Sequence, residues 1–230
     1  MTEPAGPDAE PTDRARPAGM PMFPLGTVLL PGSVLPLQIF EPRYRAMIRD
    51  CLAGDQCFGV VLIARGHEVG GGDERTDVGT VARVVRAAEL PNGMWQLLAV
   101  GTSRIRVRRW LPDDPYPQAE VEPWDDDPTA EPLDPHRYAT LLDTVRRVLA
   151  LAAEVGQPAA PATTEFADDP ALGTFQIAAA LPLGPFDLQR VLATDRVGAR
   201  AELLARECAE RTADLEGLLR LGDDGPGTEG

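Results

Sequence analysis

The stretch "LPLQIFEPRYRAMI", residues 35–48, changes character between two neighbouring residues. Its first part, "LPLQIF", carries no charge, whereas the part that follows, "EPRYR", brings an acid, a proline and two arginines around a tyrosine. Pro42 lacks an N–H group and has a φ angle close to that of a helix, so it fits the first turn of a helix but not a central strand. The sequence therefore predicts a strand that ends at Phe40 or Glu41 and a helix that starts there.

The predicted helix has one apolar face and one charged face. Its apolar residues recur at helical spacing and should face a core: Tyr44, Met47, Ile48, Cys51 and Leu52. Its arginines should lie at the exposed rim of the helix or contact a binding partner: Arg43, Arg45 and Arg49. Glu41 lies near the positive end of the helix, and we expect it to hold an arginine of a neighbouring strand, with Arg104 or Arg106 as candidates. Glu41, Pro42 and Tyr44 are thus predicted to form a structural corner.

The rest of the first half is rich in Val, Ile and Leu between Gly, Pro and Asn residues, which is typical of strands and turns. Residues 91–93, Pro-Asn-Gly, predict a hairpin turn because Asn-Gly readily takes the positive φ values of tight turns. Residues 67–77 contain a run of glycines and predict a mobile loop. Strands are predicted at residues 22–30, 34–40, 58–64, 78–90, 94–111 and 116–121.

A change in composition marks the second half of the chain. Residues 110–135 are rich in prolines and acids and contain no lysine or arginine. We therefore interpret residues 125–135, acid run included, as an extended, solvated linker and not as a cation site. Beyond the linker the apolar period becomes helical, and Asp134 and Asp169 each precede a proline, which indicates an N-cap and a first helical turn. Two further helices are predicted to begin at Pro185 and Asp195.

These patterns predict an α+β chain in which a β domain precedes a helical bundle. Both ends of the chain lack an apolar period and are rich in Pro, Gly, Ala and acids, which is typical of disorder. The predicted boundaries are a disordered tail at 1–19, a β-rich domain at 20–124, the linker at 125–135, a helical bundle at 136–221 and a second disordered tail at 222–230.

Composition narrows the classes of function. The formal net charge of −14 disfavours binding to nucleic-acid backbones or to anionic lipid. Residues 20–40 are uncharged like a membrane span, but four prolines interrupt them, so two strands joined by a turn are predicted. The cysteines lack the spacing of a disulfide framework or a zinc site and are expected to be reduced and buried in a cytoplasmic protein: Cys51, Cys57 and Cys208.

The block "MFPLGTVLLPGSVLPLQIFEPRYRAMI", residues 22–48, closely resembles the opening of the N-terminal, substrate-binding domain of Lon proteases. The resemblance covers nearly all of residues 20–221, and it includes a weaker helical match at 187–204. It implies a mixed β pseudo-barrel of the PUA-like group with one packed helix, followed by a helical bundle. Gly101 and Arg104 belong to its structural motif. The other matching blocks are "FGVVL" (58–62), "VGTVARV" (78–84), "GTSRIRV" (101–107) and "YPQAEVE" (116–122).

Catalytic machinery is not evident in the sequence. In full Lon proteases this domain precedes an ATPase module and a serine–lysine peptidase, so the resemblance implies a standalone form without those modules. The chain contains no lysine, which a Walker A loop and a Ser–Lys dyad both require. Its few serines and histidines form no recognisable catalytic or metal-binding set: Ser33, Ser103, His67 and His136. We therefore expect no enzymatic activity, no metal and no cofactor.

Three classes of function stay open. The resemblance favours binding of unfolded or exposed polypeptide, with a protease or chaperone as a further partner. The second class is RNA binding, since strand alternation would place Arg104, Arg106 and Arg108 on one face. The third is a receptor for a small ligand or an adaptor. The residues assigned to peptide binding, for which core or linker packing is an equally good explanation, are Phe40, Arg43, Trp95, Trp110 and Tyr116.

Overall fold

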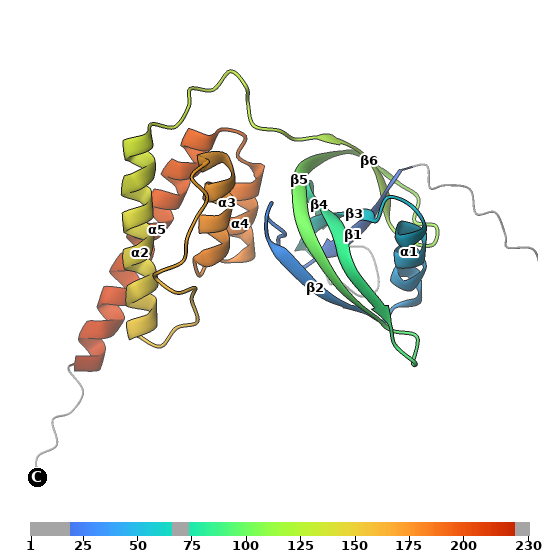
Figure 1. The fold of residues 1–230 in the computed structure, drawn as a ribbon, viewed down its shortest axis with the longest axis horizontal. Coiled ribbons are helices and arrows are strands. Elements are labelled where there is room, and N and C mark those ends of the chain that lie inside the picture. The colour runs from blue at the N-terminus through green and yellow to red at the C-terminus, as the bar shows by residue number, and fades with distance from the viewer. Residues whose placement is uncertain (1–18, 66–73, 224–230) are drawn as a thin grey trace, which may run out of the picture.

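The computed structural model describes residues 19–65 and 74–223 and shows a curled β-sheet beside a bundle of helices (Figure 1). The strands of the described residues are β1 (Met20–Leu25), β2 (Val34–Ile39), β3 (Cys57–Arg65), β4 (Glu74–Glu89), β5 (Trp95–Leu111) and β6 (Gln118–Pro123). They form one mixed sheet in the order β2-β5-β4-β3-β1-β6. An additional pairing of β6 with β5 closes this sheet into a pseudo-barrel, which confirms the predicted α+β fold.

The long strand β5 explains the shape of the barrel. On one side it pairs with β4, from Trp95 to Arg106. On the other side its first half pairs with β2, as in Leu35↔Ala99, and its second half pairs with β6, as in Val107↔Val121. Within the described residues β2 is therefore attached to β5 alone, and it forms one edge of the sheet.

The strand-to-helix corner is confirmed. β2 ends at Ile39, and α1 (Pro42–Ala53) begins at the predicted proline. Tyr44 packs edge-on against Phe23 of β1, with their ring centroids 4.3 Å apart. The buried residues of α1 are four of the five that the sequence predicts, and they complete the core of the β half: Tyr44, Met47, Ile48 and Cys51.

The segment between β1 and β2 differs from the prediction. β1 ends at Leu25 because the following residues leave the sheet and form a loop, in which the carbonyl of Leu29 accepts a hydrogen bond from the Thr80 hydroxyl at 2.6 Å. A side chain at Gly101 would overlap the carbonyl oxygen of Leu30, so this close approach of two backbones requires glycine. The structural role predicted for Gly101 is consistent with this contact.

β4 begins before the end of the predicted mobile loop. Residues 74–77 belong to β4, while residues 66–73, which include His67, lie outside the described residues. The predicted tails also lie outside them, apart from Gly19 at one end and residues 222–223 at the other. The hairpin turn between β4 and β5 is confirmed, since Gly93 has a φ of 76° and its N–H donates to the Leu90 carbonyl at 2.8 Å.

The second half is helical, and two of its predicted N-caps are confirmed. Asp134 accepts hydrogen bonds from the N–H groups of His136 and Arg137, and Asp169 accepts one from Ala171. The last helix begins at Val197, not at Asp195, whose carbonyl instead accepts the N–H of Asp127 in the linker at 2.7 Å. The helices are α2 (Pro135–Glu154), α3 (Pro170–Ala180), α4 (Pro185–Ala193) and α5 (Val197–Asp223).

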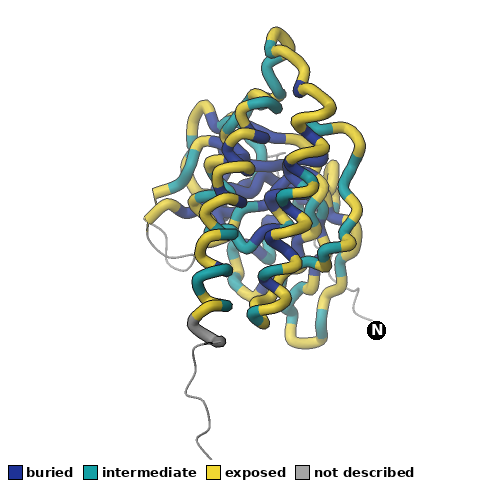
Figure 2. Tube along the Cα trace, turned by 90° about the vertical axis from the view of Figure 1, so that its left-hand side faces the viewer, coloured by how far each residue is buried: buried dark blue, intermediate teal, exposed yellow. Residues whose placement is uncertain are grey.

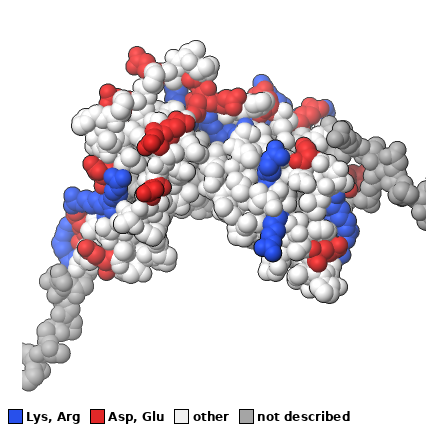
Figure 3. All heavy atoms as spheres, viewed as in Figure 1, with Lys and Arg blue, Asp and Glu red and all other residues white. Residues whose placement is uncertain are grey.

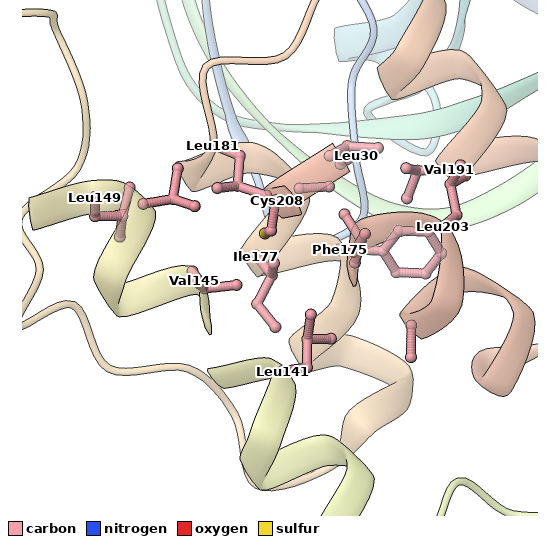
Figure 4. Close-up of a cluster of buried hydrophobic side chains, with 14 of the residues drawn as sticks. Leu30, Leu141, Val145, Leu149, Phe175, Ile177, Leu181, Val191, Leu203 and Cys208 are labelled. Atoms are coloured by element: carbon pink, nitrogen blue, oxygen red, sulfur yellow. The ribbon is translucent and has the colours of Figure 1, made fainter. Parts of the chain in front are cut away.

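The core of the bundle extends into the β half. The buried residues lie inside the bundle, while its outward faces are exposed (Figure 2). Leu30 and Val78 of the β half belong to the same buried cluster as the bundle side chains, and Figure 4 shows Leu30 among them. The side chain of Gln189 on α4 also donates to the Val78 carbonyl at 3.0 Å. Apolar packing thus continues across the predicted domain boundary.

An ionic cluster joins the same two halves and corrects two predictions. Arg104 of β5 donates to Asp126 at 2.5 Å and to the Leu192 carbonyl at 2.9 Å. Arg200 of α5, which is 0% exposed, forms a two-pronged ion pair with Asp126, whose Oδ2 lies 2.9 Å from Nη2. Burial lowers the pKa of Arg104. The linker is therefore anchored at Asp126 and not fully solvated, and Arg104 pairs with Asp126, not with Glu41.

Residues 20–40, which lack charges, form β1, β2 and the loop between them. Among the helices that the structure describes, none is both long and apolar enough to cross a membrane. The prediction of two strands in this segment is confirmed, but the longer loop of residues 26–33 joins them in place of a tight turn.

Candidate functional site

β2 presents one edge with no neighbouring strand. The N–H of Gly101 on β5 donates to the Ser33 carbonyl at 2.9 Å, and hydrogen bonds alternate along an antiparallel pair from there. The even-numbered residues Val34, Pro36 and Gln38 therefore direct their backbone groups away from β5. Proline within a strand is tolerated where its missing N–H faces an edge, which agrees with the position of Pro36. We call this row of groups the β2 edge.

Within residues 19–65 and 74–223, nothing pairs with the β2 edge. No other strand lies beside it, and no backbone hydrogen bond reaches Val34, Pro36 or Gln38 from a turn or loop. Unpaired strand edges are a known template for pairing with another chain. The β2 edge is therefore a backbone surface with unused hydrogen-bonding capacity.

A groove of about 520 Å³ lies where β2 begins, between the β half and the bundle. Of the lining residues in the described part of the chain, Glu165 alone carries a charge. We call it the groove. Its apolar walls come from the loop before β2, from the segment before α3, and from α3 and α4, through Val28, Leu30, Val34, Phe166, Ala180 and Leu188.

A smaller cavity of about 110 Å³ lies at the other end of β2. Its walls are the end of β1, including Phe23 and Leu25, the end of β2, and Tyr44 of α1. Phe40 borders it and is 58% exposed. The β2 edge thus runs from the groove at Val34 to this end cavity at Phe40.

Exposed apolar side chains continue from the β2 edge onto the outer face of the sheet. Val34 is 58% exposed, and Val85 on β4 and Leu98 on β5 are exposed as well. Leu98 lies directly opposite Pro36 in the β2–β5 pair. Adjoining apolar groups on a surface mark interaction sites more often than single exposed ones do. Figure 3 shows few charged atoms in the hollow between the two halves.

The structure brings two of the predicted binding residues to this site. Phe40 borders the end cavity, and Arg43 lies beside it, with its guanidinium 4.5 Å from the centre of the Tyr44 ring. Arg43 Nε also donates to Glu41 at 3.0 Å. The predicted partner of Glu41, an arginine from a neighbouring strand, is thus wrong, because the adjacent helix residue satisfies the carboxylate.

The three other predicted binding residues lie elsewhere or inside. Trp95 is half-buried opposite Ile39, and its indole nitrogen is buried without a hydrogen-bond partner in the described chain. Trp110 lies at the far end of β5, under the guanidinium of Arg75. Tyr116 is 2% exposed within the core of the β half, so its placement on a binding surface is corrected. Its hydroxyl donates to Asp50 at 2.9 Å.

Sequence reasoning missed Val34, Gln38 and Leu98. One signal was present, because a proline inside a strand pattern, such as Pro36, indicates an edge. The order of the strands in the sheet decides which face of that edge stays open, and a single sequence does not show that order.

The predicted arginine stripe on β5 is engaged inside the chain. Arg104 is buried against the linker, and the Arg106 guanidinium lies 3.3 Å from the centre of the Trp124 ring. Arg108 pairs with Glu122 of β6 at 2.5 Å. A phosphate would have to compete with these partners, so the structure offers no support for the RNA-binding alternative.

The thiols are buried and protonated. Burial raises the pKa of Cys51 and of Cys208 to about 12, and the pKa of Cys57 is raised by the same cause. A thiol with so high a pKa is a poor nucleophile at neutral pH. No group of three or more metal-ligating side chains gathers in the described part of the chain.

A known protein family matches both the β half and the bundle of this chain. A family model described as the ATP-dependent protease La (LON) substrate-binding domain matches residues 19–208. The Lon protease of Anaeromyxobacter dehalogenans is 31% identical over 191 residues, which is 82% of this chain and 22% of that protein. Lon protease 2 of Myxococcus xanthus is 30% identical, over 82% of this chain and 23% of that protein. The chain thus spans less than a quarter of these relatives.

Solved structures agree with the fold. A Lon N-terminal domain protein from Xanthomonas campestris is 30% identical, with a TM-score of 0.61 over 82% of this chain and 98% of that one. The N-terminal domain of a Mycobacterium avium complex Lon protease has the same fold at 19% identity, with a TM-score of 0.57 over 83% and 98%. A mixed pseudo-barrel followed by a helical bundle is thus the architecture of Lon N-terminal domains. The chain belongs to the LON substrate-binding domain family.

Proposed function

We propose that the chain binds exposed segments of unfolded proteins and does so without catalysis. The observation that carries this proposal is the β2 edge, which lies between an apolar groove and an apolar cavity. Unfolded polypeptide offers apolar side chains and unpaired backbone groups together, and this surface complements both. The family description, which names a substrate-binding domain, supports the proposal.

The test compares an unfolded with a folded form of one ligand. A reduced, alkylated and fluorescently labelled protein that cannot refold is titrated with the chain, and anisotropy reports binding; the native form of the same protein is the control. We expect only the unfolded form to bind. Absence of binding by either form, or equal binding by both, would contradict the proposal.

Two matched variants locate the surface. Leu98→Asp puts a charge beside the β2 edge, whereas Leu218→Asp puts the same charge at an exposed leucine of α5. We expect Leu98→Asp to weaken binding about tenfold or more, because an apolar contact of a leucine is lost and a carboxylate is desolvated. Leu218→Asp should bind as the unchanged chain does. Equal effects of both variants would place the contact elsewhere.

A partner is a second part of the proposal. We propose that the bound segment is presented to a separate protease or chaperone, because in the relatives the matching region is only part of a longer Lon protease. Degradation of an unfolded client by a full-length Lon protease should change when the chain is added, and should not change when Leu98→Asp is added. An identical rate of degradation without the chain, with the chain and with Leu98→Asp would contradict the proposed partner.

A further inference from the structure

We infer that a foreign polypeptide segment binds this site as an added β-strand along the β2 edge. The inference rests on the proposed function and specifies how the segment is held. β2 runs from Val34 to Ile39, so at 3.3 Å per residue the edge takes an extended segment of roughly 20 Å, or about six residues. Addition of a strand to an exposed sheet edge is a recurrent mode of peptide recognition.

The backbone of the β2 edge sets the pattern of hydrogen bonds. Val34 and Gln38 each offer one N–H and one carbonyl, and Pro36 between them offers only a carbonyl. The edge therefore has more acceptors than donors, and the incoming strand supplies the extra N–H. These bonds do not depend on the side chains of the ligand, which suits a site that accepts many different unfolded proteins.

The added strand meets an apolar environment at each end of β2. At the end of β2, side chains of the added strand meet the end cavity between β1 and β2, which Phe23, Leu25 and Leu37 line. At the start of β2 the strand passes the groove, whose bundle side includes Phe166 and Leu188. The Leu and Phe walls favour apolar side chains in both places.

The charges around the site limit which polypeptide segments can bind there. Among the described residues, the only charged ones that line the groove and the end cavity are Glu165 and Glu41, and Glu41 already pairs with Arg43. With a net charge of −14 on the whole chain, an acidic segment is repelled. We therefore expect the bound segment to be apolar and uncharged. Any charged residues that flank it should be basic.

Other occupants fit the edge less well. Two copies joined edge to edge would both lack the donor at Pro36, which removes hydrogen bonds from the centre of the pair. Residues 1–18 contain four prolines and no Val, Ile, Leu or aromatic residue, and residues 224–230 are similar in character. Such segments have low strand propensity.

The first experiment changes only the backbone of the edge. Gln38→Pro removes the second outward N–H and places a ring in the path of the added strand, while Gln38→Ala removes the same side chain and keeps the N–H. The probe is a labelled peptide of about ten residues that alternates Val and Thr and carries one terminal Arg. We expect Gln38→Pro to weaken binding about tenfold and Gln38→Ala less than about twofold.

The second experiment changes only the ligand and needs no variant. A twin peptide carries N-methyl groups on alternate residues, which keeps its side chains but blocks main-chain pairing. Binding of the twin to the unchanged chain should be at least about tenfold weaker. This comparison decides the question even if Gln38→Pro fails to fold, which its far-UV spectrum would show.

Contrary results separate the inference from the proposed function. Equal binding of both peptides, together with equal affinities of Gln38→Pro and Gln38→Ala, would overturn strand addition while leaving polypeptide binding intact. Dimerisation in sedimentation that Gln38→Pro abolishes would assign the edge to a second copy and would also overturn it. Failure of the unchanged chain to bind any unfolded polypeptide would remove the proposed function itself.

Discussion

Arg200 is the largest side chain that the chain buries completely within its described residues. Burial of a charge is unfavourable unless the charge is paired and its hydrogen-bond donors are satisfied. Asp126 supplies the counter-charge, Thr174 and backbone carbonyls accept further bonds, and the Phe175 ring lies 4.2 Å from the guanidinium. Arg104 shares Asp126, so a single carboxylate joins β5, the linker and α5.

Asp126→Asn should therefore destabilise the chain strongly. The amide cannot neutralise the buried Arg200, and loss of one partner of a buried ion pair costs about 3–5 kcal/mol. The free energy of unfolding in urea measures the effect. The exposed neighbour variant Asp125→Asn is the control and should change stability by less than about 0.5 kcal/mol. Similar stability of both variants would contradict the role given to Asp126.

The buried thiols predict a pH dependence. The pKa of Cys51 is about 12 in the folded chain and 9.0 for an ordinary thiol, so the unfolded chain loses this proton first. The free energy of unfolding should then fall as pH rises from 9 toward 12, and stay unaffected by this group at lower pH. The decline between pH values of about 8 and 10.5 should be smaller in Cys51→Ala. An equal decline in both chains would show that Cys51 does not contribute.

Among the helices and strands, the sequence predicted best those features that depend only on neighbouring residues in the chain. The Asp134–Pro135 and Asp169–Pro170 pairs predicted the starts of α2 and α3, and the apolar period of α1 predicted its buried face. The partners of Asp126 were missed because only the tertiary fold brings Arg104 and Arg200 near it. Glu41 was assigned a distant arginine, although Arg43, two residues along the chain, satisfies it. The open side of β2 was missed because strand order is not a local property.

The cap at the start of α2 gives a test at this scale. Asp134 accepts two backbone N–H groups, from His136 at 2.8 Å and from Arg137 at 3.0 Å. Asp134→Ala should cost about 1 kcal/mol of unfolding free energy, because these donors lose their partner. Asp143→Ala on the exposed face of the same helix is the control and should cost less than about 0.5 kcal/mol. A reversed order in thermal or urea unfolding would contradict the assignment of the cap.

The whole molecule holds two halves around a hollow. The linker connects the two halves along one side (Figure 1). Asp126 of this linker pairs with Arg104 and Arg200, and Leu30 packs among the bundle side chains (Figure 4). This attachment sets the distance between β2 and the helices and so defines the groove. The sequence predicted both halves and their order, but Leu30 gave no sign that it would pack in the core of the other half. The domain boundary at residues 124–125 is still a prediction.

Hydrogen–deuterium exchange on the full chain, with and without a saturating unfolded protein, shows whether unfolded polypeptide binds along the β2 edge and the groove. We expect slower exchange in two places at once: at the β2 edge, in the amides of Val34 and Gln38, and across the groove at residues 164–180. Leu35, already paired with β5, should change little. Unchanged exchange at the β2 edge despite saturation, or protection confined to the region of Trp110, would contradict the account.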